Sequence, residues 1–90
     1  MNAKMNYSDL PASRHILVIG GAGYLGSVLT RKLLNKGFRV RVLDKLIYQN
    51  GGTLYELLEN KNFSFIHGDF GNKGTLERSL KEVTDVILLA

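Results

Sequence analysis

A run of glycines, Gly20-Gly21-Ala22-Gly23-Tyr24-Leu25-Gly26, has the clearest chemical meaning in the sequence, and it lies between an apolar segment and a helical pattern. One glycine permits a tight turn with positive φ, a second lets a phosphate approach the backbone, and a third allows close packing of a helix. The helix that follows offers unpaired N–H groups and its positive dipole end to the phosphate. By spacing, either Gly20 or Gly21 is the first glycine, and Gly23 and Gly26 are the others.

A carboxylate follows the glycine run at the sequence spacing expected for a residue that contacts the ribose. Asp44 lies eighteen residues after Gly26, at the end of a second apolar segment. A carboxylate at this point accepts hydrogen bonds from both hydroxyls of an adenosine ribose and repels a 2′-phosphate. The pattern therefore predicts dinucleotide binding and favours NAD over NADP. Two alternatives stay open: Asp44 as a turn residue or helix cap, and Lys45 as a cation that compensates a 2′-phosphate.

Apolar periodicity predicts four strands that alternate with helices. The strands are expected at residues 15–19, 38–43, 63–67 and 85–90. Helices are expected from about Tyr24 to Lys36, from Thr53 onward, and after Asn72 to about Val83. Strands joined by helices form right-handed crossovers in a parallel sheet. The predicted fold class is therefore α/β, a Rossmann-type parallel sheet with βαβαβαβ connectivity and strand order 3-2-1-4.

Apolar spacing also predicts which side chains of each helix face the sheet. The expected inward residues are Leu25, Val28, Leu29 and Leu33 in the first helix, Leu54, Leu57 and Leu58 in the second, and Leu76, Leu80 and Val83 in the third. Arg39 and Arg41 alternate onto one face of the second strand. We expect this face of the sheet to be less well covered than the other.

Composition narrows the class of protein. The chain is 44% hydrophobic, which is typical of a globular domain, and it has no cysteine, which excludes a disulfide framework and thiolate chemistry. The net charge of +4 comes from scattered residues and not from a basic run, so nucleic acid is not an expected partner. No apolar stretch approaches the roughly 20 residues of a membrane span. We expect no membrane association and a cytoplasmic location.

The predicted organisation is a polar tail over residues 1–14 followed by a partial NAD-binding domain over residues 15–90. The tail is either disordered or an arm that packs on a partner subunit, so a homo-oligomer is one expected arrangement. His15 and His67 begin and end strands, and neither has a second ligand at metal spacing. No metal site is predicted.

These residues resemble the extended short-chain dehydrogenase/reductase family. The matching segments are the glycine run, Asp44-Lys45-Leu46-Ile47-Tyr48, Gly68-Asp69-Phe70 and Leu88-Leu89-Ala90. The chain is similar, more narrowly, to NAD-dependent sugar-nucleotide epimerases and dehydratases, and the Asp44–Tyr48 stretch to dTDP-glucose 4,6-dehydratases. The resemblance covers nearly all of residues 15–90. It implies NAD as the cofactor and a nucleotide sugar as a partner of the full-length protein, without specifying the sugar.

The resemblance implies a role for each matching position. Tyr24 and Leu25 would present backbone amides to the pyrophosphate, and Asp44 with the three residues after it would frame the adenosine ribose. Asp69 would accept a hydrogen bond from the adenine amino group, and Phe70 would line the adenine pocket.

Two further positions follow from the resemblance. Leu89 and Ala90 would begin the wall beside the nicotinamide ribose. Asn72 stands where the family usually has an acid, and asparagine also caps helices well. For Asp69 itself the alternative is a loop carboxylate that caps the third helix.

Hydride chemistry in this family needs a Tyr-x-x-x-Lys pair with a Ser or Thr. The four tyrosines are followed at that spacing by Pro11, Val28, Gly52 and Glu59. No catalytic residue is therefore predicted, and the chain by itself is expected to be inactive. The favoured interpretation is the NAD-binding N-terminal part of a nucleotide-sugar epimerase, dehydratase or reductase. A non-catalytic NAD(P) sensor and an interaction domain that binds no nucleotide are the alternatives.

Overall fold

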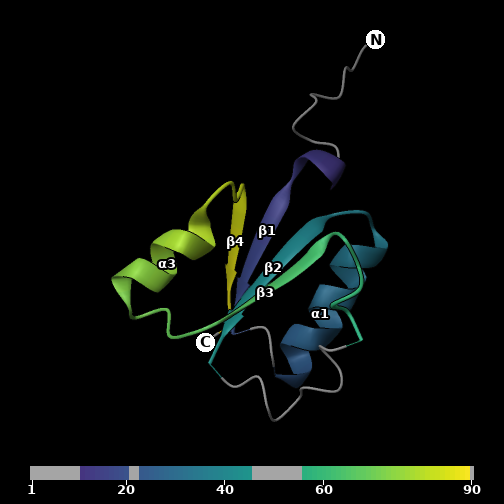
Figure 1. Ribbon diagram of the computed structural model, residues 1–90. Coiled ribbons are helices and arrows are strands. Elements are labelled where there is room, and N and C mark those ends of the chain that lie inside the picture. The colour runs from purple at the N-terminus through teal and green to yellow at the C-terminus, as the bar shows by residue number, and fades with distance from the viewer. Residues whose placement is uncertain (1–10, 21–22, 46–55, 90) are drawn as a thin grey trace.

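The structure is a computed structural model that describes residues 11–20, 23–45 and 56–89. Its centre is a parallel sheet of four strands: β1 (His15–Ile19), β2 (Arg39–Asp44), β3 (Phe63–His67) and β4 (Asp85–Leu88). Figure 1 shows them side by side in the order β3-β2-β1-β4, and each neighbouring pair is parallel. This order confirms the predicted Rossmann-type α/β fold, with β4 at an edge of the sheet.

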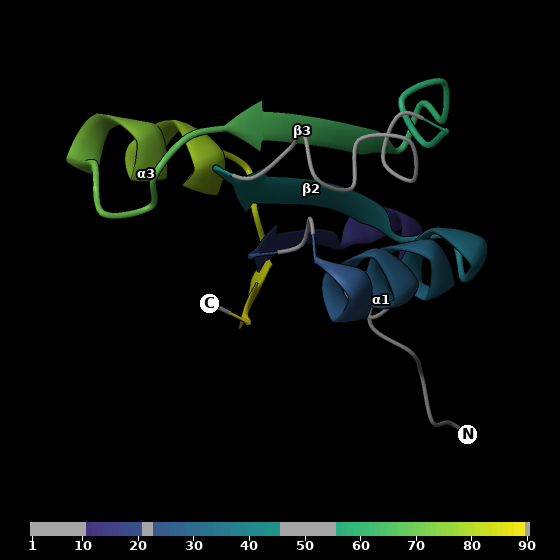
Figure 2. The same cartoon turned by 90° about the horizontal axis from the view of Figure 1, so that it is seen from below.

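Two helices cover opposite faces of the sheet, as Figure 2 shows. Helix α1 (Tyr24–Asn35) connects β1 to β2, and helix α3 (Lys73–Leu80) connects β3 to β4. Helix α1 ends at the predicted place because Gly37 adopts a φ of +94°, a left-handed conformation that favours glycine. In the part of the chain that the structure describes, no helix combines the length and apolar character of a membrane span.

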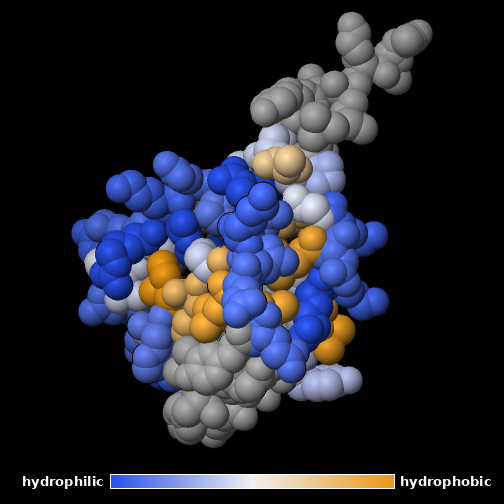
Figure 3. Space-filling model, turned by 45° about the vertical axis from the view of Figure 1, so that its right-hand side comes forward, coloured by the Kyte–Doolittle hydropathy of each residue, from blue (hydrophilic) through white to orange (hydrophobic). Residues whose placement is uncertain are grey.

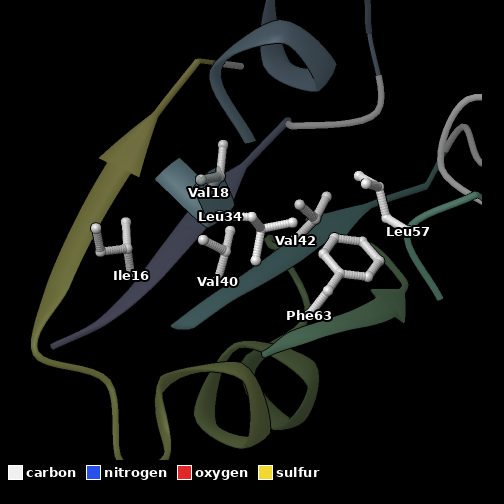
Figure 4. Close-up of a cluster of buried hydrophobic side chains, with 7 residues drawn as sticks. All are labelled: Ile16, Val18, Leu34, Val40, Val42, Leu57 and Phe63. Atoms are coloured by element: carbon white, nitrogen blue, oxygen red, sulfur yellow. The ribbon is translucent and has the colours of Figure 1, made fainter. Parts of the chain in front are cut away.

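The larger hydrophobic core lies under α1. Alternate residues of the strands point to this face because side chains along a strand alternate in direction. The buried members are Ile16, Val18, Leu34, Val40, Val42, Leu57 and Phe63 (Figure 4). Burial of one such side chain is worth about 1.5–3 kcal/mol, so this cluster is the main apolar contribution to the stability of the sheet.

The smaller core lies under α3, on the face that carries the two arginines of β2. Its buried residues are Leu17, Ile19 and Leu43, with Ile66, Leu76 and Val83 packed against them. Val86 and Leu88 of β4 lie beside this core but remain 50% and 58% exposed. The arginine face is thus the less covered one, as expected. Figure 3 shows one side of the molecule where hydrophobic residues reach the surface between hydrophilic ones.

The predicted inward face of α1 is confirmed at Leu29 and Leu33 and wrong at Leu25. Leu25 is 65% exposed, and the buried residues of the helix are Gly26, Ser27, Thr30 and Leu34. Small side chains at the first three of these positions let the helix backbone lie close to the sheet. Leu29 and Leu33 are partly buried and pack against the larger core, as predicted.

Two other leucines that were predicted to face the sheet are exposed instead. Leu58 is 51% exposed, because residues 56–59 form a turn that buries only Leu57. Leu80 is 41% exposed, because α3 ends there and Glu82 has a φ of +63°. The chain then turns back, so Val83 reaches the core from a loop. Residues 53–55 of the predicted capping box lie outside the described residues.

The N-terminal part of the fold begins before β1. Pro11–Ser13 form a short 3-10 helix, η2, so these residues belong to the folded structure and not to a featureless tail. Arg14 donates two hydrogen bonds to Asp85, Nε to Oδ1 at 3.0 Å and Nη2 to Oδ2 at 2.7 Å. This fork joins the start of β1 to the start of β4, and with a further hydrogen bond from Thr84 it lowers the pKa of Asp85.

His15 generates a test of how pH affects stability. The side chain is buried, and burial lowers its pKa, as do the nearby charges of Arg41 and Arg39, although Glu82 acts in the opposite direction. An unfolded chain takes up a proton at the ordinary imidazole pKa of about 6.5, whereas folded His15 does so only at lower pH. We therefore expect the free energy of unfolding to fall as the pH is lowered from about 7 to 5.

Urea unfolding at several pH values measures this effect. In the variant His15→Gln, which cannot titrate, the free energy of unfolding should depend less on pH across the same interval. An identical slope in both proteins would show that His15 does not contribute to it.

Candidate dinucleotide-binding site

The candidate site lies where β1, β2 and β3 end. Because the strands are parallel, their carboxyl ends meet at one edge of the sheet, the place where open α/β sheets bind ligands. A pocket of about 60 Å³ opens there. It is lined by Ile19, Gly20, Leu43, Asp44, Lys45, Gly68, Asp69 and Phe70. Ligand pockets typically measure about 300–1,000 Å³, so this pocket is smaller than a typical ligand site.

Gly20 makes the turn out of β1. Its φ is +86°, a conformation in which a residue with a Cβ is strained. Its N–H donates to the carbonyl of Leu43 at 2.8 Å, which extends the pairing of β1 and β2 beyond the end of β1. Gly20 thus has the geometry predicted for the first glycine of the run, and Gly21 lies outside the described residues.

The N-terminus of α1 is accessible to a ligand. Gly23 is the N-cap residue, and it has no side chain that could cap this end of the helix. The amide of Ser27 makes the bond to the carbonyl of Gly23, so the N–H groups of Tyr24, Leu25 and Gly26 precede the first helical bond. The side chains of Tyr24 and Leu25 are 81% and 65% exposed. A Cβ placed on Gly23 would meet no described atom within 4 Å.

Asp44 ends β2 at the mouth of the pocket, where its side chain is half-buried. Its backbone carbonyl accepts a hydrogen bond from Gly68 at 3.1 Å. One position further, Nε2 of His67 lies 3.0 Å from the carbonyl oxygen of Lys45. These two contacts join the ends of β2 and β3, and they bring Asp44 and the loop after β3 to the same pocket.

Asp69 is held in a defined orientation by the loop after β3. Its Oδ1 accepts a hydrogen bond from the N–H of Gly71 at 2.8 Å, and its Oδ2 lies 3.9 Å from Nζ of Lys45. The cap of α3 is Asn72, whose Oδ1 accepts from the N–H of Thr75 at 2.9 Å. Asp69 is therefore not the helix cap, and it is one of the residues that line the pocket. Phe70 also lines the pocket and is 43% exposed.

The structure brings together five of the predicted site residues in this pocket, namely Gly20, Asp44, Lys45, Asp69 and Phe70. The other predicted site residues lie outside the pocket lining or outside the described residues. Gly23, Tyr24, Leu25 and Gly26 form the start of α1, outside the pocket lining. The N–H of Leu89 donates to the carbonyl of Ile19 at 2.8 Å, so Leu89 lies beside the end of β1. Leu46, Ile47 and Ala90 lie outside the described residues.

Sequence reasoning missed several residues of the site. Ile19, Leu43 and Gly68 also line the pocket, and His67 contacts the backbone of Lys45. Each stands at the end of a strand, which is the signal that could have identified them. Among the residues that the structure describes, no group of three His, Cys, Asp or Glu side chains is arranged to bind a metal ion.

Comparison with known proteins identifies the family. The model of the NAD-dependent epimerase/dehydratase family matches residues 16–90. The chain belongs to this family. It is 36% identical over 76 residues to the probable UDP-arabinose 4-epimerase 3 of Oryza sativa subsp. japonica, a match that covers 80% of this chain and 19% of the relative.

Two further comparisons, both with dTDP-glucose 4,6-dehydratases, agree with this family assignment. The dTDP-glucose 4,6-dehydratase of Xanthomonas campestris pv. campestris is 39% identical over 67 residues, covering 73% of this chain and 19% of the relative. The crystal structure of dTDP-glucose 4,6-dehydratase from Bacillus anthracis in complex with NAD superposes with a TM-score of 0.77 and 29% identity. That match covers 86% of this chain and 26% of the other. The chain thus spans about a fifth of the length of its curated relatives.

The two glycines at the start of the site generate a test of local stability. The variant Gly20→Ala should lower the free energy of unfolding by about 1–2 kcal/mol, because alanine is strained at positive φ. The matched variant Gly23→Ala should change it little, since Gly23 has a φ of −76° and open space for a Cβ. Chemical denaturation of both variants measures the difference. Equal stabilities would contradict the assigned backbone geometry.

Proposed function

We propose that residues 15–90 are the NAD-binding part of a nucleotide-sugar epimerase, dehydratase or reductase. The observation that supports this function best is a convergence at one edge of the sheet. An uncapped helix N-terminus preceded by a glycine turn lies there together with the carboxylates of Asp44 and Asp69. These groups are complementary to the pyrophosphate, ribose and adenine of a dinucleotide.

The phosphate end of the cofactor would bind at α1. In this proposal Gly20 and Gly23 leave room for the pyrophosphate, and the amides of Tyr24 and Leu25 donate to its oxygens. Gly23 fits the role because its missing side chain leaves space that a branched residue would fill. No acidic side chain lies in the first turn of α1 to repel the phosphates.

The adenosine end would bind between the ends of β2 and β3. Asp44 would accept hydrogen bonds from the ribose hydroxyls, and Lys45, Leu46 and Ile47 would lie beside it. Oδ1 of Asp69 accepts a hydrogen bond from Gly71, and Oδ2, 3.9 Å from Nζ of Lys45, would accept one from the adenine amino group. Phe70 would contact the adenine ring. Leu89 and Ala90 would lie toward the nicotinamide ribose.

Lys45 bears on the choice between NAD and NADP. A free cation next to Asp44 would stabilise a 2′-phosphate, but the ammonium of Lys45 lies near Asp69, on the adenine side. This ion pair between exposed groups is weak, so the preference is proposed to rest on the carboxylate of Asp44, which would repel a 2′-phosphate. NAD remains the proposed cofactor.

Activity would require residues beyond those that bind the cofactor. In this family a tyrosine next to a lysine takes the hydroxyl proton of the sugar, and none of the 90 residues given forms a Tyr-x-x-x-Lys pair. The same observation favours a second candidate, a non-catalytic NAD(P) sensor of the atypical short-chain dehydrogenase type. A cytoplasmic location and a homo-oligomeric state stay predictions.

Cofactor preference tests the proposed function. Calorimetric titration of NADH and NADPH into the chain should give tighter binding of NADH, because Asp44 repels a 2′-phosphate. The variant Asp44→Ala should narrow the difference by about tenfold, equivalent to roughly 1.4 kcal/mol. Equal affinities in the wild-type chain would remove Asp44 from the ribose site, and binding of neither cofactor would leave an interaction domain as the remaining candidate.

The glycine loop has its own test. The variant Gly23→Val should lower the affinity for NADH more than tenfold, because the branched side chain occupies the space proposed for the pyrophosphate. Circular dichroism should show an unchanged fold, since the backbone of Gly23 is in an ordinary extended conformation. Gly23→Ala, with one methyl group, is the graded control. Unchanged affinity in a folded Gly23→Val variant would exclude the loop from the site.

We expect the chain by itself to show no epimerase, dehydratase or dehydrogenase turnover. Incubation with NAD and a panel of UDP-, dTDP- and CDP-sugars, followed by absorbance of NADH and chromatography of the sugars, measures this. Turnover that is abolished by a substitution within residues 15–90 would show that the chain carries its own proton-transfer group.

A further inference from the structure

We infer that Arg41 is a positioning residue for the adenine pocket, which it does not touch. This inference rests on the proposed function and extends it to a side chain in the middle of β2. The role would be to hold α3 against the sheet, and thereby to fix the loop that carries Asp69 and Phe70.

Arg41 makes an unusual set of contacts for a residue in a central strand. Its Nη1 donates to the backbone carbonyls of Ser79 at 2.7 Å, Lys81 at 3.0 Å and Arg78 at 3.4 Å. Its Nε lies 3.4 Å from Oγ of Ser64 in β3. The guanidinium therefore bridges the sheet and the C-terminal end of α3, where the helix dipole favours a positive charge.

Apolar packing alone holds α3 weakly. The helix has eight residues, and the only one of them that is buried is Ser79. Its hydroxyl bonds within the helix, to the carbonyl of Thr75, and not to the sheet. Leu76 is partly buried against the smaller core, and Leu80 is 41% exposed. A helix this short is marginal in isolation, so the contacts of Arg41 carry a large share of its attachment.

The other end of α3 is continuous with the adenine loop. Asn72 caps the helix, and its N–H donates to the carbonyl of Asp69 at 3.0 Å. Thr75 lies tightly against Gly68, so closely that a Cβ on Gly68 would be 2.8 Å from its Cγ2. Because Asp69 and the first turn of α3 form one packed unit, a shift of the helix moves the carboxylate in the pocket.

A ratio of two affinities tests this inference. ADP has the adenine amino group that Asp69 is proposed to bind, and IDP lacks it. A hydrogen bond to a carboxylate is worth roughly tenfold in affinity, so the wild-type chain should bind ADP about tenfold more tightly than IDP. In Arg41→Met the ratio should fall to about twofold or less, because a shift of α3 would move the loop that carries Asp69.

A matched control separates positioning from general stability. Arg14→Met removes the fork to Asp85 at the other end of the sheet, so it should lower stability while it leaves the ADP/IDP ratio near tenfold. Arg41→Lys keeps the charge but loses the guanidinium fork, and it should give an intermediate ratio. If Arg41→Met does not fold, the ADP/IDP affinity ratio of Arg41→Lys tests the inference instead.

The outcomes distinguish the inference from the proposed function. A wild-type ratio in folded Arg41→Met, or in Arg41→Lys when the Met variant does not fold, would overturn the positioning role and leave NAD binding intact. An equal fall of the ratio in Arg14→Met would also overturn it. If the wild-type chain binds neither ADP nor NADH, the proposed function fails and the inference fails with it.

Discussion

Strand β1 lies between β2 and β4, and all five of its residues are buried. Its parallel pairing with both neighbours determines where the chain leaves the sheet. Two hydrogen bonds continue the ladders past the strand ends, from Gly20 to Leu43 and from Leu89 to Ile19. The glycine turn, the N-terminus of α1 and the end of β2 are thereby placed at one edge. The candidate site depends on this arrangement more than on any single side chain within it.

Much of this architecture could be predicted from the sequence. The uninterrupted apolar run of β1 identified a strand that is covered on both faces, and the glycine turn identified the first crossover. The strand order followed from the alternation of strands and helices, for which the doubly wound order is expected. Asp44 could be assigned to the pocket because parallel strands present their last residues at the same edge.

The remaining features depend on contacts that a one-dimensional pattern does not contain. Leu25 shares its helical spacing with the partly buried Leu29 and Leu33, but the first turn packs on the sheet through Gly26 and Ser27, and Leu25 is exposed. Leu80 fits the helical period, yet the positive φ of Glu82 ends that period. The alternation of Arg41 predicted only that one face of the sheet would be poorly covered. Nothing in the spacing shows that its guanidinium contacts the end of a helix 37 to 40 residues later.

The fork between Arg14 and Asp85 joins residues that are 71 positions apart. Strands β1 and β4 pair across a similar separation, so one edge of the most buried strand gains its partner only after the intervening segments have been synthesised. Contacts between distant residues form slowly, because the entropy of a long loop is lost before the contact is made. On the ribosome, β1 therefore presents free backbone groups and apolar side chains until β4 has emerged. In that interval we expect the nascent chain to be most exposed to mispairing.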